Sequence, residues 1–235
     1  MSNFALLLQF PSALILNSLK LRHSPFKQHK AASQILMAER VDPSTTLSVN
    51  IAPPSATQDI ALIATLTDLV NAVYGASESD IFGEGYQRTS HDEVSSFIEN
   101  GELAIARLNG EEVVGCMFVR RDPHSTDGKR RGGFGMLALD PNQQGLGLGR
   151  MMVLFAEEHC RERLECEIMR LELLFPITKL HAGKGRLQAW YLRMGYEIIR
   201  VGSFADEYPH LEKQLAGPTE YRIFEKSLKM PEASN

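Results

Sequence analysis

The residues best suited to chemistry form a glycine-rich loop between an apolar run and an amphipathic stretch. Residues 136–139 are apolar, and Asp140-Pro141-Asn142 is a turn sequence, because proline fixes its own φ and the flanking side chains bond to nearby backbone. Gly145, Gly147 and Gly149 then alternate with leucines, so the N–H groups of the following helix can be approached without a Cβ in the way. Those groups lack partners inside the helix, and the helix dipole adds positive charge there. The segment predicts a strand, a loop and a helix that bind an anion such as pyrophosphate.

Other nucleotide-binding loops fit this segment less well. A Walker loop needs Lys and then Ser or Thr after its last glycine, whereas Arg150 and Met151 follow Gly149. The dinucleotide pattern is met loosely by residues 133–138, but these lead into a strand and not into a strand-to-helix turn. P-loop and dinucleotide enzymes are therefore disfavoured, and a glycine-rich turn without a ligand is the remaining alternative.

Length, charge and cysteine content narrow the class of protein. A chain of 235 residues suggests one domain with extensions, and a net charge of −4 argues against a nucleic-acid surface and favours a cationic or neutral substrate. Cys116, Cys160 and Cys166 lie at no metal-ligand spacing, so we expect free thiols, no disulfide and no metal. Cys116 lies in a strand-like run, where a small buried apolar role outweighs that of a catalytic thiol.

The two ends of the chain differ from its centre. Residues 1–38 contain no acid, and basic residues punctuate their leucine-rich pieces, so we expect residues 1–42 to be a disordered or targeting extension. This segment is either a transit peptide or a gene-model extension ahead of Met37. We therefore expect a cytoplasmic protein, or a mitochondrial one if residues 1–36 are a transit peptide. No run reaches the roughly 18 unbroken apolar residues of a membrane span. Residues 229–235 are expected to be a frayed tail.

Periodicity and turn residues predict the elements of the central region. Apolar residues at three- and four-residue spacing indicate helices, alternating β-rich runs indicate strands, and Asn109-Gly110 indicates a hairpin. We expect the loops 75–89 and 203–218 to be long excursions, the first of them functional. The predicted strands are 47–51, 102–107, 112–119, 132–139, 168–175, 196–201 and 221–228, and the predicted helices are 58–74 capped by Ser55 or Thr57, 90–100 capped by Ser90 with Glu93, 147–164 and 185–194.

Two motifs together resemble those of the GNAT superfamily of acetyl-CoA-dependent acyltransferases. Gln144, Gly147 and Gly149 match its pyrophosphate loop Q/R-x-x-G-x-G/A, after L-A-L-x-P at residues 137–141. Residues 191–196 match the ending Y-x-x-x-G-F/Y of its penultimate helix. Residues 171–174, 190–191 and 204–211 also resemble a fungal and bacterial GNAT group of undefined substrate. The resemblance implies an α/β (α+β) domain over residues 47–228, with a central mixed, mostly antiparallel twisted sheet of about seven strands flanked by about four helices.

The resemblance also implies a donor site for acetyl-CoA, with no metal. Lys184 stands where the family often has an Asn that helps to hold the pantetheine arm, so contacts to pantetheine are the least certain part of this site. The thioester carbonyl is expected against a backbone N–H near residues 137–139, an electrostatic role for the main chain. The expected cofactor-binding residues are Leu137, Ala138, Leu139, Gln144, Gly145, Leu146, Gly147, Leu148, Gly149, Arg150 and Lys184.

Two side chains are the candidate acid and base. The resemblance places the hydroxyl of Tyr191 beside the departing sulfur, where a phenol with a pKa of about 10 can protonate the thiolate; the alternative is a core aromatic. Glu172 is the first candidate for the base that removes a proton from the attacking amine, although an ion pair with Arg170 explains this residue equally well. Glu207 and His210 are looser candidates.

The resemblance implies an N-acetyltransferase in which an amine attacks acetyl-CoA directly within a ternary complex. The acceptor is expected to be a small-molecule or peptide amine, with no nucleic acid or membrane partner, and the protein to be a monomer or homodimer. A non-catalytic acyl-CoA sensor of the same fold is the alternative. The presence of Tyr191 favours the enzyme.

Overall fold

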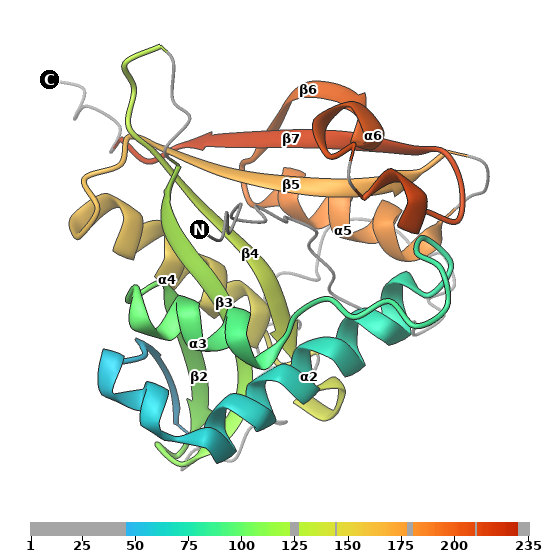
Figure 1. Ribbon diagram of the computed structural model, residues 1–235. Coiled ribbons are helices and arrows are strands. Elements are labelled where there is room, and N and C mark those ends of the chain that lie inside the picture. Colours follow the sequence, from blue (N-terminus) through green and yellow to red (C-terminus); the bar gives the residue numbers. More distant parts are fainter. Residues whose placement is uncertain (1–45, 123–126, 144, 178–180, 210, 230–235) are drawn as a thin grey trace, which may run out of the picture.

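A single twisted sheet organises the chain, as the computed structural model of residues 46–122, 127–143, 145–177, 181–209 and 211–229 shows (Figure 1). Within these ranges the sheet has seven strands in the order β1-β2-β3-β4-β5-β7-β6. Only β4 and β5 pair in parallel, so the predicted mixed, mostly antiparallel α/β sheet is confirmed. The strands are β1 (Leu47–Ile51), β2 (Leu103–Leu108), β3 (Glu112–Asp122), β4 (Arg131–Leu139), β5 (Ile168–Pro176), β6 (Glu197–Ser203) and β7 (Thr219–Ser227).

Helices cover both faces of the sheet. Helices α2 and α3 pack on one face, which we call the α2 face, and α4 and α5 pack on the other, the α4 face (Figure 1). Leu66, Val70 and Val73 of α2 are buried because their three- and four-residue spacing puts them on one side of the helix. The helical elements are η1 (Pro54–Gln58), α2 (Ile60–Glu78), α3 (His91–Glu99), η2 (Pro141–Gln143), α4 (Leu148–Glu162), α5 (Ala182–Arg193), α6 (Phe204–Glu207) and η3 (Glu212–Gln214).

The sheet opens between β4 and β5. These strands pair only at their first residues, from Arg131 opposite Ile168 to Gly133 opposite Arg170. Beyond that point β4 continues along β3 and β5 continues along β7, so the two halves of the sheet diverge (Figure 1). Among the described residues, the backbone of β4 from residue 134 onward therefore has no strand partner on its β5 side.

Two predicted helix starts were wrong. Helix α2 begins after Asp59, whose Oδ1 accepts a hydrogen bond from the Leu62 N–H at 2.9 Å, and it continues to Glu78. The proposed caps Ser55 and Thr57 lie instead in η1, because Pro54 favours the first turn of a separate short helix. Helix α5 starts earlier than predicted, at Ala182, where the imidazole of His181 caps the N–H of Lys184 at 3.1 Å. The Ser90 cap of α3 is confirmed, since its Oγ accepts from the Glu93 N–H at 3.2 Å.

The two long loops meet each other. Phe82 bridges Leu215, and backbone hydrogen bonds join Gly83 N to Gln214 O and Ala216 N to Ile81 O, both at 2.8 Å. A third apolar cluster forms beneath them from side chains of both loops, β5 and β7. The segments predicted as separate excursions thus build one wall over the β5–β7 half of the α2 face.

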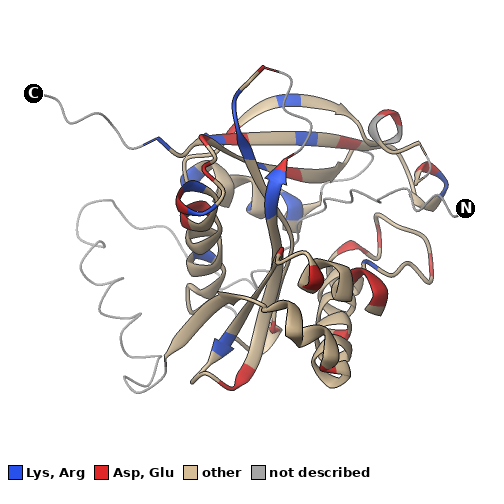
Figure 2. Ribbon diagram, turned by 60° about the vertical axis from the view of Figure 1, so that its left-hand side comes forward, with Lys and Arg blue, Asp and Glu red and all other residues tan. Residues whose placement is uncertain are grey.

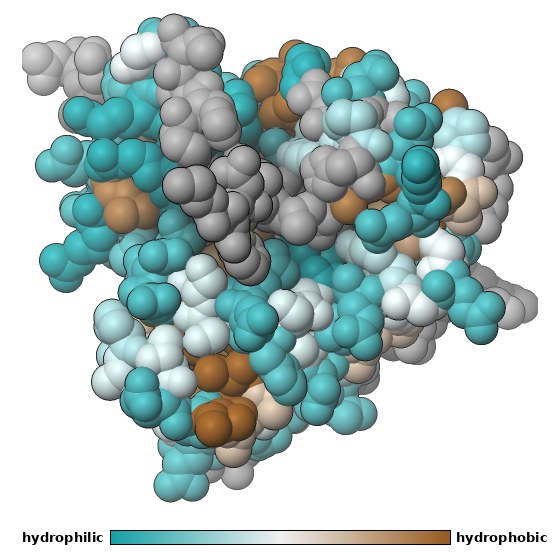
Figure 3. Space-filling view, viewed as in Figure 1, coloured by the Kyte–Doolittle hydropathy of each residue, from teal (hydrophilic) through white to brown (hydrophobic). Residues whose placement is uncertain are grey.

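Helix α2 is long and apolar enough to cross a membrane by length and composition alone, the one such helix among the described residues. In the structure its apolar side packs on β3 and β4, which is the ordinary behaviour of a core helix. Hydrophilic side chains predominate on the face shown in Figure 3, and the apolar groups there are separated from one another.

Candidate active site

A β-bulge in β4 lies at the opening of the sheet. Cys116 pairs with Ala138 and Phe118 pairs with Gly135, so two residues of β4, Met136 and Leu137, oppose a single residue of β3. Met136 has a φ of 52°, a left-handed conformation that costs about 1–3 kcal/mol in a residue other than glycine. The bulge redirects the backbone of β4 where β5 no longer pairs with it. Sequence reasoning missed Met136, although glycines inside a strand are a recognised sign of a bulge.

The glycine-rich loop leads directly from β4 into α4. Gly145 and Gly147 have φ of 84° and 80°, and a Cβ on either would meet open space, so the backbone is accessible from outside. Gly147 is the N-cap of α4, and the first turn of α4 contains no acidic residue. The N–H groups at this end of the helix are suited to an anion, and binding of a pyrophosphate there stays a prediction. Of the expected loop residues, Leu148 and Gly149 are buried, Arg150 is exposed, and Gln144 lies outside the described residues.

Lys184 is buried, with 1% of its surface exposed. Its Nζ forms an ion pair with the Oε1 of Glu78, at the end of α2, which is itself 1% exposed. This pair links α5 to the end of α2, which lies below α5 in Figure 1. The ammonium of Lys184 is thus paired with a carboxylate. The expected contact of Lys184 with pantetheine stays a prediction.

Tyr191 lies completely buried on the α4 face. From α5 its ring packs against Phe134 of β4, Tyr196 just before β6 and Phe224 of β7, at centroid distances of 6.2, 5.8 and 6.0 Å. Tyr191 is therefore a core aromatic in its packing. The packing of the ring does not test the hydroxyl, whose role as the acid stays a prediction.

Glu172 lies on the opposite, α2 face of β5, as the predicted alternation of this strand requires. Its Oε2 accepts a hydrogen bond from the Tyr208 hydroxyl at 3.4 Å, and the hydroxyls of Tyr208 and Tyr221 lie 2.8 Å apart. Burial raises the pKa of Glu172 to about 7, against the lowering effects of Tyr221, Arg170 and Tyr208. A carboxyl group that titrates near neutral pH is suited to exchange protons there.

Arg170, the proposed ion-pair partner of Glu172, is held by other carboxylates. Its Nη1 lies 3.0 Å from Asp122 Oδ2 and its Nη2 lies 2.8 Å from Glu225 Oε1. The charge of Arg170 lowers the pKa of Glu172, but this effect is smaller than the increase caused by burial. The geometry thus favours a titrating carboxyl group over a structural ion pair.

Charged and small residues surround Glu172 on the α2 face. In the sheet register Gly133 of β4 lies between Arg120 of β3 and Arg170 of β5, so the floor between the two arginines carries no side chain. Figure 2 shows basic and acidic residues interspersed along the strands of the sheet. Arg120 is nearly buried, its Nη1 lies 3.8 Å from Glu102 Oε2, and burial lowers its pKa. The result is a polar, largely desolvated surface beside the opening.

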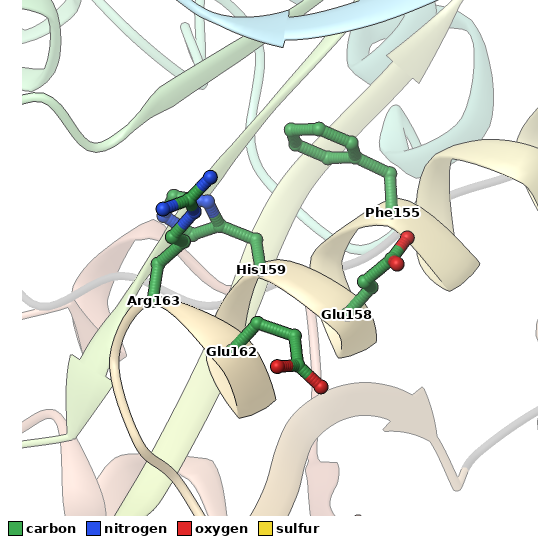
Figure 4. A pocket seen from close by; sticks show the side chains of 5 residues that line it. All are labelled: Phe155, Glu158, His159, Glu162 and Arg163. Atoms are coloured by element: carbon green, nitrogen blue, oxygen red, sulfur yellow. The ribbon is translucent and has the colours of Figure 1, made fainter.

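A surface hollow of about 540 Å³ lies elsewhere, along the second half of α4 (Figure 4). Its lining side chains come from α4 and from the residue that caps its end: Phe155, Glu158, His159, Glu162 and Arg163. The two carboxylates would repel a pyrophosphate, so this hollow does not suit coenzyme A. His159 stacks on Phe155 with a centroid distance of 5.9 Å, and burial followed by the charge of Arg163 lowers its pKa, in keeping with a structural histidine.

The weaker base candidates, Glu207 and His210, stay predictions. His210 and the side chain of Glu207 lie outside the described residues. Tyr208 and Tyr221, which contact Glu172 or each other, were not proposed from sequence. The position of Tyr221 depends on the register between β5 and β7, and that of Tyr208 depends on how the 203–218 loop folds back over the sheet. Among the described residues no three His, Cys, Asp or Glu side chains converge to hold a metal ion.

The family follows from a comparison with protein-family models. The model of the Acetyltransferase (GNAT) family matches residues 70–196, which span the β4 bulge, the glycine loop and the helix of Tyr191. The chain belongs to the GNAT acetyltransferase family. None of the curated proteins compared with this GNAT chain matches it.

Solved structures share the GNAT fold at low sequence identity. The NatC complex bound to Gag peptide and CoA includes a chain that is 16% identical, with a TM-score of 0.54 over 78% of this chain and 99% of that one. The ribosomal-protein-alanine N-acetyltransferase from Brucella melitensis is 17% identical, with a TM-score of 0.53 over 77% and 99%. N-acetylglutamate synthase from Neisseria gonorrhoeae, complexed with coenzyme A and N-acetyl-glutamate, is 16% identical, with a TM-score of 0.51 over 79% of this chain and 36% of that one. At these identities the likeness concerns the fold.

Proposed function

We propose that this GNAT protein transfers an acetyl group from acetyl-CoA to an amine, with Glu172 as the general base. The observation that carries the proposal is the buried carboxyl of Glu172, whose pKa of about 7 allows it to accept a proton at neutral pH. It lies on β5 beside the opening of the sheet, and the α2 face over it is walled by the two joined loops. An amine acceptor that enters on this face meets a proton acceptor next to the donor.

Acetyl-CoA fits the remaining parts of the site. In the proposed complex the N–H groups at the start of α4 and the glycine loop bind the pyrophosphate, and the pantetheine arm lies along the unpaired side of β4. The thioester carbonyl accepts a hydrogen bond from a backbone N–H next to the bulge at Met136, among residues 137–139. A main-chain donor held rigidly in this way stabilises the oxyanion as it develops.

The proposed reaction needs two proton transfers. Glu172 takes a proton from the amine, directly or through water, and the amine nitrogen attacks the carbonyl carbon. The tetrahedral oxyanion then collapses with cleavage of the carbon–sulfur bond, and the thiolate leaves. Tyr191 donates a proton to this sulfur, since a phenol is a suitable acid for a thiolate of similar pKa. The products are the acetylated amine and free coenzyme A.

The proposed acceptor is an amine. Structures of the same fold include one bound to a peptide and one complexed with an acetylated amino acid. For this chain we propose a small-molecule or peptide amine, without a narrower choice. Acceptors of both kinds therefore belong in the first assay.

The test is acceptor-dependent release of the coenzyme A thiol with a panel of amines and peptides. For an active acceptor we expect turnover to rise with pH through about 7, and Glu172→Gln to lose roughly 10²- to 10⁴-fold in kcat together with this pH dependence. Glu197→Gln, on the exposed edge strand β6, is the matched control and should keep full activity. Tight acetyl-CoA binding with no thiol release across the panel would support the acyl-CoA sensor instead.

A further inference from the structure

Two of the three cysteines lie side by side at the closed end of the opening. Cys160 is in the last turns of α4, Cys166 precedes β5, and the Cys166 N–H donates to the Cys160 carbonyl at 2.8 Å. A Cβ built on Gly132 of β4 would lie 2.5 Å from the Cys160 Sγ and 3.3 Å from the Cys166 Sγ. Both sulfur atoms thus border the small space that the missing side chain of Gly132 leaves, and the Cys166 thiol also donates to the Leu164 carbonyl at 3.5 Å.

Two arginines hold the loop that carries Cys166. The Nη2 of Arg121 donates to the Leu164 carbonyl at 2.5 Å, and the Nε of Arg130 donates to the Glu165 carbonyl at 2.6 Å. Glu165 has a φ of 52°, so the chain turns sharply just before Cys166. The arrangement brings two cationic groups close to one sulfur and directs that sulfur toward Cys160. Cations beside a thiol stabilise its thiolate, which is the reactive form.

The two thiols differ in access and in acidity. Cys166 lines an open surface hollow of about 440 Å³, whereas Cys160 lies completely buried behind it. The hydrogen bond from Cys160, together with Arg121 and Arg130, lowers the pKa of Cys166 despite its burial, and the same hydrogen bond raises the pKa of Cys160. Cys116 is the contrasting case, since burial in β3 raises its pKa to about 12.

We propose that Cys166 and Cys160 are a redox-active dithiol that a hydroperoxide oxidises to a disulfide. The Cys166 thiolate attacks a peroxide oxygen, the O–O bond breaks, and a sulfenic acid forms as hydroxide or alkoxide leaves. The Cys160 sulfur then attacks the sulfenic sulfur, the S–S bond forms, and the departing hydroxide takes the Cys160 proton as water. The two sulfurs together supply the two electrons that reduce the peroxide, and a dithiol reductant reverses the change.

Peptide mapping of the full-length folded protein tests this proposal. Arg161 and Arg163 stand between the two cysteines, so trypsin places Cys160 and Cys166 on separate peptides unless a disulfide joins them. After brief treatment with hydrogen peroxide and alkylation of remaining thiols, we expect a linked peptide pair that lacks two hydrogens and that dithiothreitol separates. Cys116 should remain reduced.

Single variants assign the two roles. In Cys160→Ala the sulfenic acid on Cys166 should persist and be trapped by dimedone, with at least about a tenfold larger yield than in the parent protein. In Cys166→Ala, Cys160 should stay reduced. The rate of Cys166 alkylation should have its pH midpoint roughly one unit or more below the ~8.5 of an unperturbed thiol.

The proposal fails if the linked pair appears only in denaturant, or if dimedone labels Cys166 equally in both proteins. It also fails if the alkylation midpoint of Cys166 is that of an ordinary thiol. Far-ultraviolet circular dichroism of each variant shows whether a negative result comes from a folded protein. If Cys160→Ala does not fold, the parent protein alone decides, through the linked pair and the alkylation midpoint.

Discussion

Replacing Glu172 with glutamine should make the protein more stable at alkaline pH while it lowers turnover by the roughly 10²- to 10⁴-fold expected for loss of a general base. Burial raises the pKa of Glu172 from 4.5 to about 7, which corresponds to about 3 kcal/mol of free energy. Below pH 4.5 the carboxyl is protonated in the folded and the unfolded chain, so the stabilising effect is fully present. Above pH 7 the folded protein must ionise a buried group, and about 3 kcal/mol of stability is lost.

Glutamine keeps the shape of the side chain and removes its titration. Glu172→Gln should therefore melt higher than the parent protein at pH 8.5, by about 6–12 °C for a domain of this size, and at nearly the same temperature at pH 4.5. Differential scanning calorimetry across this pH range measures the effect. A carboxyl group kept at some cost in stability is typical of a functional site.

Glu225→Gln is a control of opposite sign. Burial raises the pKa of Glu225, but hydrogen bonds from Arg131 and Arg170 outweigh it and lower the pKa overall. Its contribution is present above the unfolded pKa and lost as pH falls, so this variant should be less stable at pH 8.5. If Glu172→Gln also loses stability at pH 8.5, Glu172 is a structural ion-pair partner and the reasoning is refuted.

Three further changes test the other parts of the site. Tyr191→Phe should lower turnover by roughly 10²- to 10⁴-fold at saturating substrates with little change in melting temperature, and full turnover would remove the proposed acid. Gly147→Glu should weaken acetyl-CoA binding in calorimetry at least about tenfold through charge repulsion. The control is Gly147→Asn, because asparagine tolerates the left-handed φ of 80° at this position, and this variant should bind acetyl-CoA more tightly than the Glu variant. Equal affinities of the two variants would contradict the loop assignment. Removing residues 1–36 should leave activity and melting temperature unchanged, and a large drop in either would show that the segment packs on the domain.

Local patterns predicted most of the fold. Apolar spacing identified the core helices, and Asn109-Gly110 identified the β2–β3 hairpin, whose turn residues have φ of 51° and 78°. These signals are readable because each depends on residues within one or two turns of chain. The glycine loop and Tyr191 were recognised for the same reason, since each belongs to a short motif.

Features that depend on contacts between distant segments were not predictable. Glu78 and Lys184 are separated by 106 positions, and nothing near either residue signals that a buried lysine will meet a carboxylate. The bulge at Met136 depends on the register against β3, and the contact of Tyr208 with Glu172 depends on how the 203–218 loop folds back over the sheet. Short-range periodicity carries no information about contacts between distant segments or about strand register.

The divergence of β4 and β5 explains how the proposed acid and base can serve one reaction. Successive side chains of β5 point to opposite faces, so Leu171 and Leu173 pack with Tyr191 on the α4 face while Glu172 lies on the α2 face. In a continuous sheet the backbone would separate these two faces. Here the strands part after Gly133, and a thioester lying in that opening would be accessible from both sides. An amine deprotonated by Glu172 could then attack from the α2 face while Tyr191 protonates the sulfur from the α4 face, which is why the proposed chemistry requires the splayed sheet.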